Sequence, residues 1–276
     1  MDPVSIVLKA DLDFLRDLVR RESGIVVDAD KDYLLETRLA PVCRGAGIEG
    51  IGELVRRLRE TPYHPLRDMV TEALTTNETS FFRDVHPFET LARHILPELV
   101  QRLRPNRRIG IWCAASSCGQ EPYSLAMILR TRFPEVIDWT LDFVASDLSR
   151  QMIERCRRGV YSQLEVNRGL PVEYLARWFK QSGREWTLAP EIREMIHFRV
   201  MNLTASWREM PRCDLVLVRN VLIYFDQETR LRIFRGIEKL LQPGGYLLLG
   251  STECLPEEVQ GLERQQHGTT VYYRRI

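Results

Sequence analysis

Apolar side chains at the start of the chain recur at the spacing of amphipathic helices. Over residues 11–19 they return every three or four positions, and Gly24 follows as a stop signal for a helix. No run in this part alternates as a half-buried strand would, so we expect an N-terminal all-helical domain over residues 1–75. The further helices are predicted over residues 31–44, 51–60 and 65–74.

From residue 106 onward, short apolar runs alternate with helical segments. This alternation is typical of an α/β domain with a mostly parallel sheet, which we place at residues 106–276. Residues 76–105 are interpreted as a linker followed by a helix, which Arg104-Pro105 ends. The predicted strands cover 109–114, 141–146, 214–219, 246–250 and 269–274, and the predicted helices cover 121–132, 149–157 and 227–241.

One stretch of the α/β domain departs from the alternation. Residues 158–200 contain a predicted short helix over 172–179 and two β-like runs, 186–189 and 195–200, with Gly183 in the turn before them. We interpret this stretch as a small inserted antiparallel β-subdomain.

Charge and composition exclude several classes of protein. The 39 Lys and Arg residues against 38 Asp and Glu leave a net charge of +1, whereas a general nucleic-acid binder has a large basic excess. No apolar run approaches the ~20 residues that cross a bilayer, and residues 1–10 lack the basic start and apolar stretch of a signal peptide. We therefore expect a cytoplasmic protein without membrane insertion. The six cysteines form no Cys-x-x-Cys and the five histidines no close pair, so we expect reduced thiols and no metal site.

The sign of the charge changes within the helical part. Residues 1–37 hold nine acids and five bases, whereas residues 38–67 hold six arginines and three glutamates. Charges on amphipathic helices usually form a solvated face, but a basic surface can also meet an acidic partner. Both interpretations stay open for this segment.

The loop after the first predicted strand is built from small residues, Ala114 to Gly119. Such a loop lets a ligand approach the backbone at the carboxyl edge of a parallel sheet. It has neither the Gly-Lys-Ser/Thr of a phosphate loop nor a Gly-x-Gly-x-x-Gly fingerprint. Pro243-Gly244-Gly245, between a predicted helix and a strand, is also found in adenosylmethionine-dependent methyltransferases of this fold, and it favours S-adenosyl-L-methionine over a dinucleotide.

Asp147 ends the second predicted strand of the α/β domain. An acid at this position can accept both ribose hydroxyls of an adenosine ligand, as in dinucleotide sites. It can equally serve as the N-cap of the helix that follows. This position alone does not distinguish the two roles.

The segment Asn77-Glu78-Thr79-Ser80-Phe81-Phe82-Arg83 resembles the entry motif of the CheR family, the chemotaxis receptor glutamate methyltransferases. Other strings follow in the family's order and extend the resemblance over nearly the whole chain, the helical part included. The sequence departs from the family where Gln120 replaces the usual Glu and where Ala115 stands in place of a common Gly. The matching strings are residues 119–124, 145–147, 202–203, 219–225 and 248–253.

The resemblance implies a Rossmann-like α/β methyltransferase domain that uses S-adenosyl-L-methionine and releases S-adenosyl-L-homocysteine. It assigns Arg83 and Tyr224 to the transfer site, Glu121 to the ammonium of the cofactor and Asp147 to its ribose. The implied adenine contacts are Asn202 and Leu203. Capping of the next helix is the alternative role of the motif residues Asn77 and Thr79. The cofactor-binding set implied by the resemblance is Asn77, Thr79, Arg83, Glu121, Asp147, Asn202, Leu203, Arg219 and Asn220.

The implied reaction makes little demand on proton transfer. A glutamate carboxylate has an ordinary pKa of about 4.3 and is already a nucleophile at pH 7, so no general base is needed. The task of the enzyme is to hold this carboxylate in line with the methyl group. Arg83 and Tyr224 can orient it.

The implied partners are the acidic cytoplasmic helices of methyl-accepting chemotaxis receptors. Salt should weaken their contact with a basic surface. Some family members also bind a receptor C-terminal peptide by strand addition to the inserted subdomain, but the turn over residues 180–185 is short, and we expect no such binding here. No feature of the sequence identifies a regulatory protein partner. The candidate docking residues are Arg38, Arg44, Arg56 and Arg57.

Two other functions stay open on the sequence. One is a methyltransferase for a small molecule or a nucleic-acid base, which the near-zero net charge and the absence of an Asn/Asp-Pro-Pro-Tyr/Phe string disfavour. The other is an adaptor that binds receptor and cofactor without turnover, which only the Gln120 departure favours.

Overall fold

The computed structural model of the chain describes residues 7–61 and 65–276. Its backbone divides into two compact units, one of Met1–Thr76 with Tyr224–Thr229 and one of Asn77–Ile223 with Arg230–Ile276. Residues 1–6, on which most of the expectation about a signal peptide falls, and His64 lie outside the described residues.

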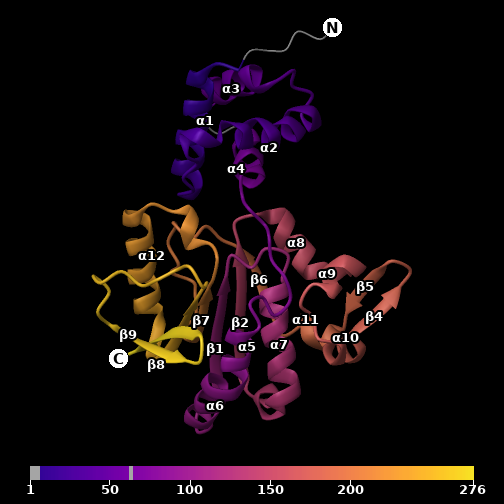
Figure 1. Cartoon of the computed structure of the whole chain (residues 1–276), viewed down its shortest axis with the longest axis vertical. Coiled ribbons are helices and arrows are strands. Elements are labelled where there is room, and N and C mark those ends of the chain that lie inside the picture. The colour runs from indigo at the N-terminus through magenta and orange to yellow at the C-terminus, as the bar shows by residue number, and fades with distance from the viewer. Residues whose placement is uncertain (1–6, 62–64) are drawn as a thin grey trace. The chain divides into compact units, whose positions relative to one another are not determined.

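The first unit is an all-helical bundle, as predicted (Figure 1). Leu15, Leu35 and Leu54 come from three different helices and are fully buried in one apolar core. Tyr224–Thr229 belongs to this unit because Ile25 pairs with Phe225 in an isolated antiparallel bridge. The helices are α1 (Lys9–Ser23), α2 (Asp32–Gly45), α3 (Ile51–Glu60) and α4 (Leu66–Ala73), with a 3-10 turn at Ala29–Lys31.

The second unit is built on a seven-stranded sheet in the order β6-β2-β1-β7-β8-β10-β9. The first five strands of that order are parallel, and β10 and β9 add an antiparallel edge. All parallel strands therefore end at the same edge of the sheet, where open α/β sheets bind ligands. The strands are β1 (Arg108–Ala114), β2 (Thr140–Asp147), β6 (His197–Val200), β7 (Cys213–Val218), β8 (Leu241–Leu249), β9 (Leu262–His267) and β10 (Thr270–Arg275).

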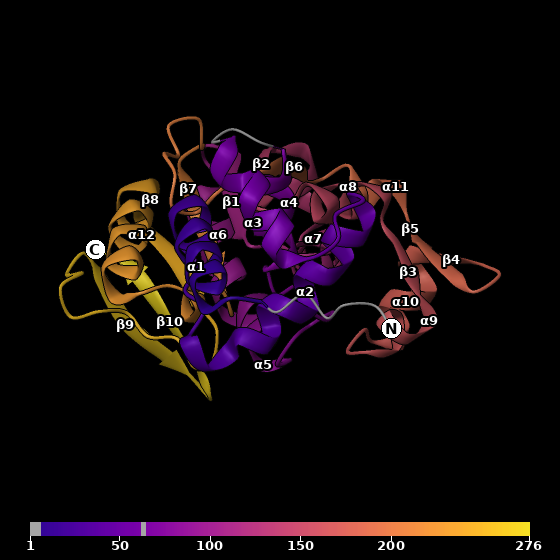
Figure 2. The same ribbon diagram turned by 90° about the horizontal axis from the view of Figure 1, so that it is seen from above.

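Both faces of this sheet are covered. Alternate residues of β1 point to opposite faces, so neighbouring residues of the strand contact different elements. Ile111 packs in one core with Leu99 and Tyr123 of two helices, whereas the next residue, Trp112, contacts Trp207 edge-to-face at 4.9 Å between ring centroids. The helices are α5 (His86–Thr90), which continues through a π-helical turn at Leu91–Ile95 into α6 (Leu96–Leu103), then α7 (Gln120–Arg132), α8 (Arg150–Arg158) and α12 (Gln227–Leu240), with 3-10 turns at Pro134–Asp138 and Leu222–Tyr224 (Figures 1 and 2).

A separate three-stranded antiparallel sheet, β3-β5-β4, projects from the second unit beside short helices (Figure 2). This agrees with the predicted antiparallel insertion, but the last run assigned to it does not belong there. Residues 197–200 form β6, which pairs parallel with β2 in the large sheet. The elements of the insertion are β3 (Val160–Ser162), α9 (Gln163–Asn167), α10 (Val172–Trp178), β4 (Phe179–Ser182), β5 (Glu185–Leu188) and α11 (Pro190–Arg193).

Two further details differ from the sequence expectation. The edge strand β9 was not predicted, because it alternates irregularly and buries only Leu262. Pro243-Gly244-Gly245 is not a turn ahead of a strand but interrupts β8 itself, where the pairing with β7 jumps from Cys213–Leu241 to Leu215–Tyr246. No helix in the described part of the chain is both long and apolar enough to span a bilayer.

Candidate functional site

The loop after β1 is held in a strained conformation at the carboxyl edge of the sheet. Ala115 and Ser117 adopt left-handed backbone angles, with φ of 53° and 50°, which non-glycine residues rarely occupy. The Ser116 N–H donates to the Ser146 carbonyl at 2.9 Å, and the Tyr161 hydroxyl donates to the Cys118 carbonyl at 2.8 Å. Strain of this kind persists only where the surroundings hold it, and it is common at ligand sites.

Asp147 joins this loop to the end of β2. Its Oδ2 accepts the Ser117 N–H at 2.8 Å and its Oδ1 accepts the Ser149 N–H at 2.9 Å. The cap of α8 is supplied by Ser149, whose hydroxyl accepts the Met152 N–H at 3.2 Å. The structure therefore gives the N-cap role to Ser149 and leaves Asp147 as a buried acid at the strand end.

The two residues expected at the adenine follow β6, next to Asp147. The Met201 N–H donates to the Asp147 carbonyl at 2.8 Å, which brings this segment to the end of β2. Asn202 Oδ1 accepts the Thr204 N–H at 2.9 Å and shapes the turn, while Leu203 is buried. The structure thus brings Asp147, Asn202 and Leu203 to one end of neighbouring strands.

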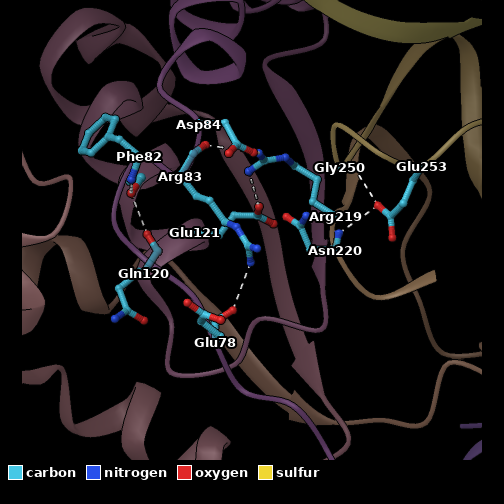
Figure 3. Close-up of polar contacts among 11 residues, drawn as sticks. Glu78, Phe82, Arg83, Asp84, Gln120, Glu121, Arg219, Asn220, Gly250 and Glu253 are labelled. Atoms are coloured by element: carbon cyan, nitrogen blue, oxygen red, sulfur yellow. Dashed lines mark hydrogen bonds and ion pairs between the residues drawn. The ribbon is translucent and has the colours of Figure 1, made fainter. Parts of the chain in front are cut away.

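Arg219 lies at the end of β7 and is the most deeply buried charge of the site. Its side chain is only 1% exposed, and its guanidinium donates to Glu121 Oε2 at 2.8 Å and to Asp84 Oδ2 at 2.7 Å (Figure 3). It also donates to the Arg83 carbonyl at 3.2 Å. Burial raises the pKa of Glu121, and Arg219 opposes that shift. The sequence indicated Arg219 and Glu121 separately but not their pairing, nor Asp84.

The entry motif is anchored by its two phenylalanines. Phe81 contacts Tyr161 edge-to-face at 4.9 Å, and Phe82 stacks on Tyr174 at 5.0 Å. The Phe82 N–H donates to the Ser124 hydroxyl of α7 at 2.9 Å. With its neighbours buried in this way, Arg83 is fixed at its backbone although its side chain is half-buried.

The start of the motif contacts both the β1 loop and the insertion. The Asn77 carbonyl accepts the Ser117 hydroxyl at 2.8 Å. Arg83 Nη1 donates to the Glu78 carbonyl at 3.0 Å, and the Glu78 carboxylate pairs with Arg168 at 2.6 Å, which lowers its pKa. Thr79 is half-buried within the same segment.

Gln120 does not face this network. It is buried at the start of α7, where its Oε1 accepts the Cys118 thiol at 2.8 Å. The residue that departs from the family therefore packs internally, whereas Glu121 beside it contacts Arg219.

Asn220 begins a tight turn after β7. Its φ is 59°, in the left-handed region, and its N–H donates to Glu253 Oε2 at 2.8 Å (Figure 3). No role for Glu253 was predicted from the sequence. The family-like string 248–253 includes Glu253, but its role depends on the meeting of two strand ends, which no local pattern encodes.

The remaining predicted residues lie in the helical unit. Tyr224 ends the 3-10 turn and its carbonyl accepts the Val26 N–H at 2.9 Å. Arg38 donates to the carbonyls of Leu74 and Thr75, each at 3.0 Å. Arg56 and Arg57 both pair with Glu53, at 2.7 and 2.8 Å, whereas Arg44 is exposed and has no ion pair with another described residue.

The residues at the sheet edge fit S-adenosyl-L-methionine in their chemistry. The site contains two buried carboxylates, Asp147 and Glu121, whose oxygens suit hydroxyl and ammonium donors, and a buried apolar side chain, Leu203, which suits the face of a base. These groups come from the ends of β2 and β6 and from the start of α7.

Comparisons with known proteins identify the family of the chain. Residues 77–272 match the family described as CheR methyltransferase, SAM binding domain, and residues 10–75 match CheR methyltransferase, all-alpha domain. The chain is 39% identical over 270 residues to chemotaxis protein methyltransferase 1 of Pseudomonas aeruginosa, covering 96% of this chain and 97% of that one. It is 40% identical over 247 residues to a chemotaxis protein methyltransferase of Vibrio parahaemolyticus, covering 88% of each. The chain belongs to the CheR family of S-adenosyl-L-methionine-dependent chemotaxis protein methyltransferases.

Proposed function

We propose that this protein transfers the methyl group of S-adenosyl-L-methionine to glutamate carboxylates on the cytoplasmic helices of chemotaxis receptors, giving γ-glutamyl methyl esters. The single observation that carries the proposal is the convergence of the Arg219 network, Asp147 and the Arg83 motif at one edge of the parallel sheet. An edge with acids for a nucleoside and an arginine, Arg83, for an incoming carboxylate suits methyl transfer to an acidic side chain.

The cofactor, when bound, supplies a methyl group on a positively charged sulfur, which needs no further activation. Asp147 would hold the ribose, and Glu121 the ammonium of the methionine part. One Glu121 oxygen already accepts Arg219, which fixes the carboxylate for that task. Asn77, Thr79, Asn202, Leu203, Arg219 and Asn220 complete the proposed binding set.

Arg83 would orient the receptor carboxylate. Its Nη1 donates to the Glu78 carbonyl, so part of its donor capacity is already engaged. With fewer free donors, Arg83 would hold the receptor carboxylate through one oxygen. Hydrogen bonds from the guanidinium to both oxygens would make the carboxylate a weaker nucleophile. We assign Tyr224 to the same task of orientation. Because the substrate carboxylate is ionised at pH 7, none of these residues has to remove a proton.

Receptor docking is proposed for the arginines of the helical unit, with Arg44 foremost. Arg38, Arg56 and Arg57 already make hydrogen bonds or ion pairs inside the unit. Arg44 is exposed on α2, and among the described residues it has no ion pair that would have to break before it meets an acidic helix.

The test is methyl transfer from tritiated S-adenosyl-L-methionine to a receptor cytoplasmic fragment. We expect incorporated label that is released as methanol by mild base, since esters hydrolyse where N-methyl groups do not. Asp147→Ala should abolish cofactor binding by calorimetry. Base-stable label, or cofactor bound with no transfer to any receptor fragment, would contradict the proposal.

A further inference from the structure

A single carboxylate binds the ends of two neighbouring strands together. Glu253, in the loop after β8, accepts four backbone N–H groups. Oε2 accepts those of Gly250 at 2.7 Å and Asn220 at 2.8 Å, and Oε1 accepts those of Val221 at 2.9 Å and Leu222 at 2.7 Å. Figure 3 shows the carboxylate between Gly250 and Asn220.

Three of these donors are consecutive, from Asn220 to Leu222. Successive N–H groups converge in this way where a left-handed residue precedes right-handed ones, and the resulting concavity binds anions. Asn220, with φ of 59°, supplies the left-handed residue. Here the anion comes from the chain itself, and it satisfies donors that strand and helix ends otherwise leave unpaired.

Gly250 is required by this close approach. A Cβ at that position would lie 2.8 Å from the Asn220 nitrogen and 2.8 Å from Glu253 Oε2. Both distances are far below ordinary van der Waals contact, so any side chain would separate Asn220 from the end of β8. Gly250 and the Glu253 carboxylate therefore both hold residues 220–222 against the end of β8, and we call this contact the junction.

The junction holds the loop on which much of the proposed chemistry depends. Arg219 and Asn220 lie in it, and Leu222 begins the 3-10 turn that ends at Tyr224. Arg219 is tied on one side to Asp84 and Glu121. Glu253 supplies the corresponding tie for the backbone that follows.

We propose that Glu253 is a positioning residue for methyl transfer: its carboxylate fixes the backbone of residues 220–222 and thereby sets where Arg219 and Asn220 lie. The inference rests on the proposed function, because Arg219 and Asn220 take their roles from it. Glu253 would act through the loop, because both of its carboxylate oxygens accept backbone N–H groups.

Glu253→Gln tests the proposal, since it keeps the shape but replaces one acceptor oxygen with an NH₂ that faces N–H donors. The matched control is Glu257→Gln, an exposed acid four residues along. We expect the control to match wild type and kcat of Glu253→Gln to fall about tenfold to a hundredfold, as small displacements of reacting groups do. Rates are expressed per S-adenosyl-L-homocysteine-binding site, counted by calorimetry.

A purely structural role would lower the number of binding-competent sites and leave kcat per site unchanged. That outcome, with kcat per site within twofold of wild type, would overturn the inference. Gly250→Ala keeps the carboxylate but separates the strand ends, and it should lower kcat per site in the same way. If Glu253→Gln does not fold, the kcat per site of Gly250→Ala tests the inference in its place. Loss of base-labile transfer in wild type and in Glu257→Gln would instead refute the proposed function.

Discussion

Arg219 is withdrawn from water almost completely, yet it has two carboxylates and a carbonyl as partners. A buried guanidinium with such partners is tolerated because each desolvated charge faces an opposite one. The same arrangement brings three distant segments together: the entry motif through Asp84, α7 through Glu121, and the end of β7. A side chain predicted only as a cofactor contact is thus also the centre of the site's own structure.

Removing this guanidinium should leave Glu121 buried without a counter-charge. We expect Arg219→Met to lower the free energy of unfolding by about 3–5 kcal/mol, measured by urea denaturation, the usual cost of breaking a buried pair from one side. Glu121→Gln added to Arg219→Met should recover part of that loss, because the uncompensated charge is then gone. A double variant less stable than Arg219→Met would contradict this account.

The loss should also depend on pH. Burial raises the folded-state pKa of Glu121 above its ordinary value of 4.5, and without Arg219 nothing of that size opposes burial. A raised carboxyl pKa favours folding at low pH, where the group is protonated in both states, and that advantage fades as pH rises. The stability gap between wild type and Arg219→Met should therefore be larger at pH 8 than at pH 5. An equal gap at both values would mean that Glu121 is not the group left unpaired.

Arg83 and Arg168 both contact Glu78, so they form a matched pair for kinetics. Arg83 Nη1 donates to the Glu78 carbonyl, whereas Arg168 pairs with the Glu78 carboxylate on the surface, where the side chains of Arg168 and Glu78 are both more than half exposed. We expect Arg83→Ala to lower kcat at least tenfold with little change in cofactor affinity, and Arg168→Ala to change either by less than twofold. If Arg83→Ala weakens cofactor binding as much as turnover, Arg83 belongs with the cofactor contacts instead.

At the scale of elements, the entry motif depends on the insertion as well as on its own sequence. Gly169, which follows α9, has a φ of +87°, and a Cβ there would lie 2.2 Å from the Phe81 carbonyl oxygen. Gly183, in the β4–β5 turn, has a φ of +60° but nothing within 4 Å of a Cβ. Both glycines have a positive φ, but only Gly169 is packed closely against the backbone of another segment.

This difference makes a direct test of the packing between insertion and motif. Gly183→Ala should cost about 1–2 kcal/mol, the penalty of a left-handed alanine. Gly169→Ala should cost more, because the Phe81 backbone must also move, and it should reduce methyl transfer where Gly183→Ala does not. Thermal unfolding and kcat measured on both variants decide; equal effects would show that Phe81 is free to move.

The elements that sequence predicts well are those whose pattern is local. Residues 109–114 read as a strand because β1 is buried on both faces, and the small residues after it indicated a ligand loop. Residues 197–200 alternate polar and apolar side chains, a pattern that predicts a strand but does not identify its partner. Because that partner is β2, some fifty residues earlier, the strand was assigned to the wrong sheet. Asp84 and Glu253 were missed for the same reason: their roles depend on partners far along the chain.

At the scale of the whole molecule, the net charge of +1 conceals an uneven distribution. Most arginines of the helical unit are neutralised locally: Glu53 accepts both Arg56 and Arg57, and its pKa falls to about 2 as a result. Arg56 pairs with both Glu53 and Glu60, so it would have to break or share these ion pairs to bind an acidic partner. The sequence did not distinguish these arginines as docking candidates. The structure does, because it shows which of them already make ion pairs or hydrogen bonds within the unit.

Arg44→Gln and Arg56→Gln remove the same charge from the same unit, and they test whether docking uses contact or long-range field. If the receptor binds by direct contact, Arg44→Gln should raise the receptor KM about two- to fivefold at low salt, the size of one exposed ion pair. Arg56→Gln should change it less, because Arg56 is engaged with Glu53 and Glu60. If only the field matters, both variants should raise KM equally, since the charge lost is the same. Raising ionic strength should reduce the difference in KM between wild type and Arg44→Gln in either case. If Arg44→Gln has the same KM as wild type at low salt, Arg44 does not contribute to receptor docking.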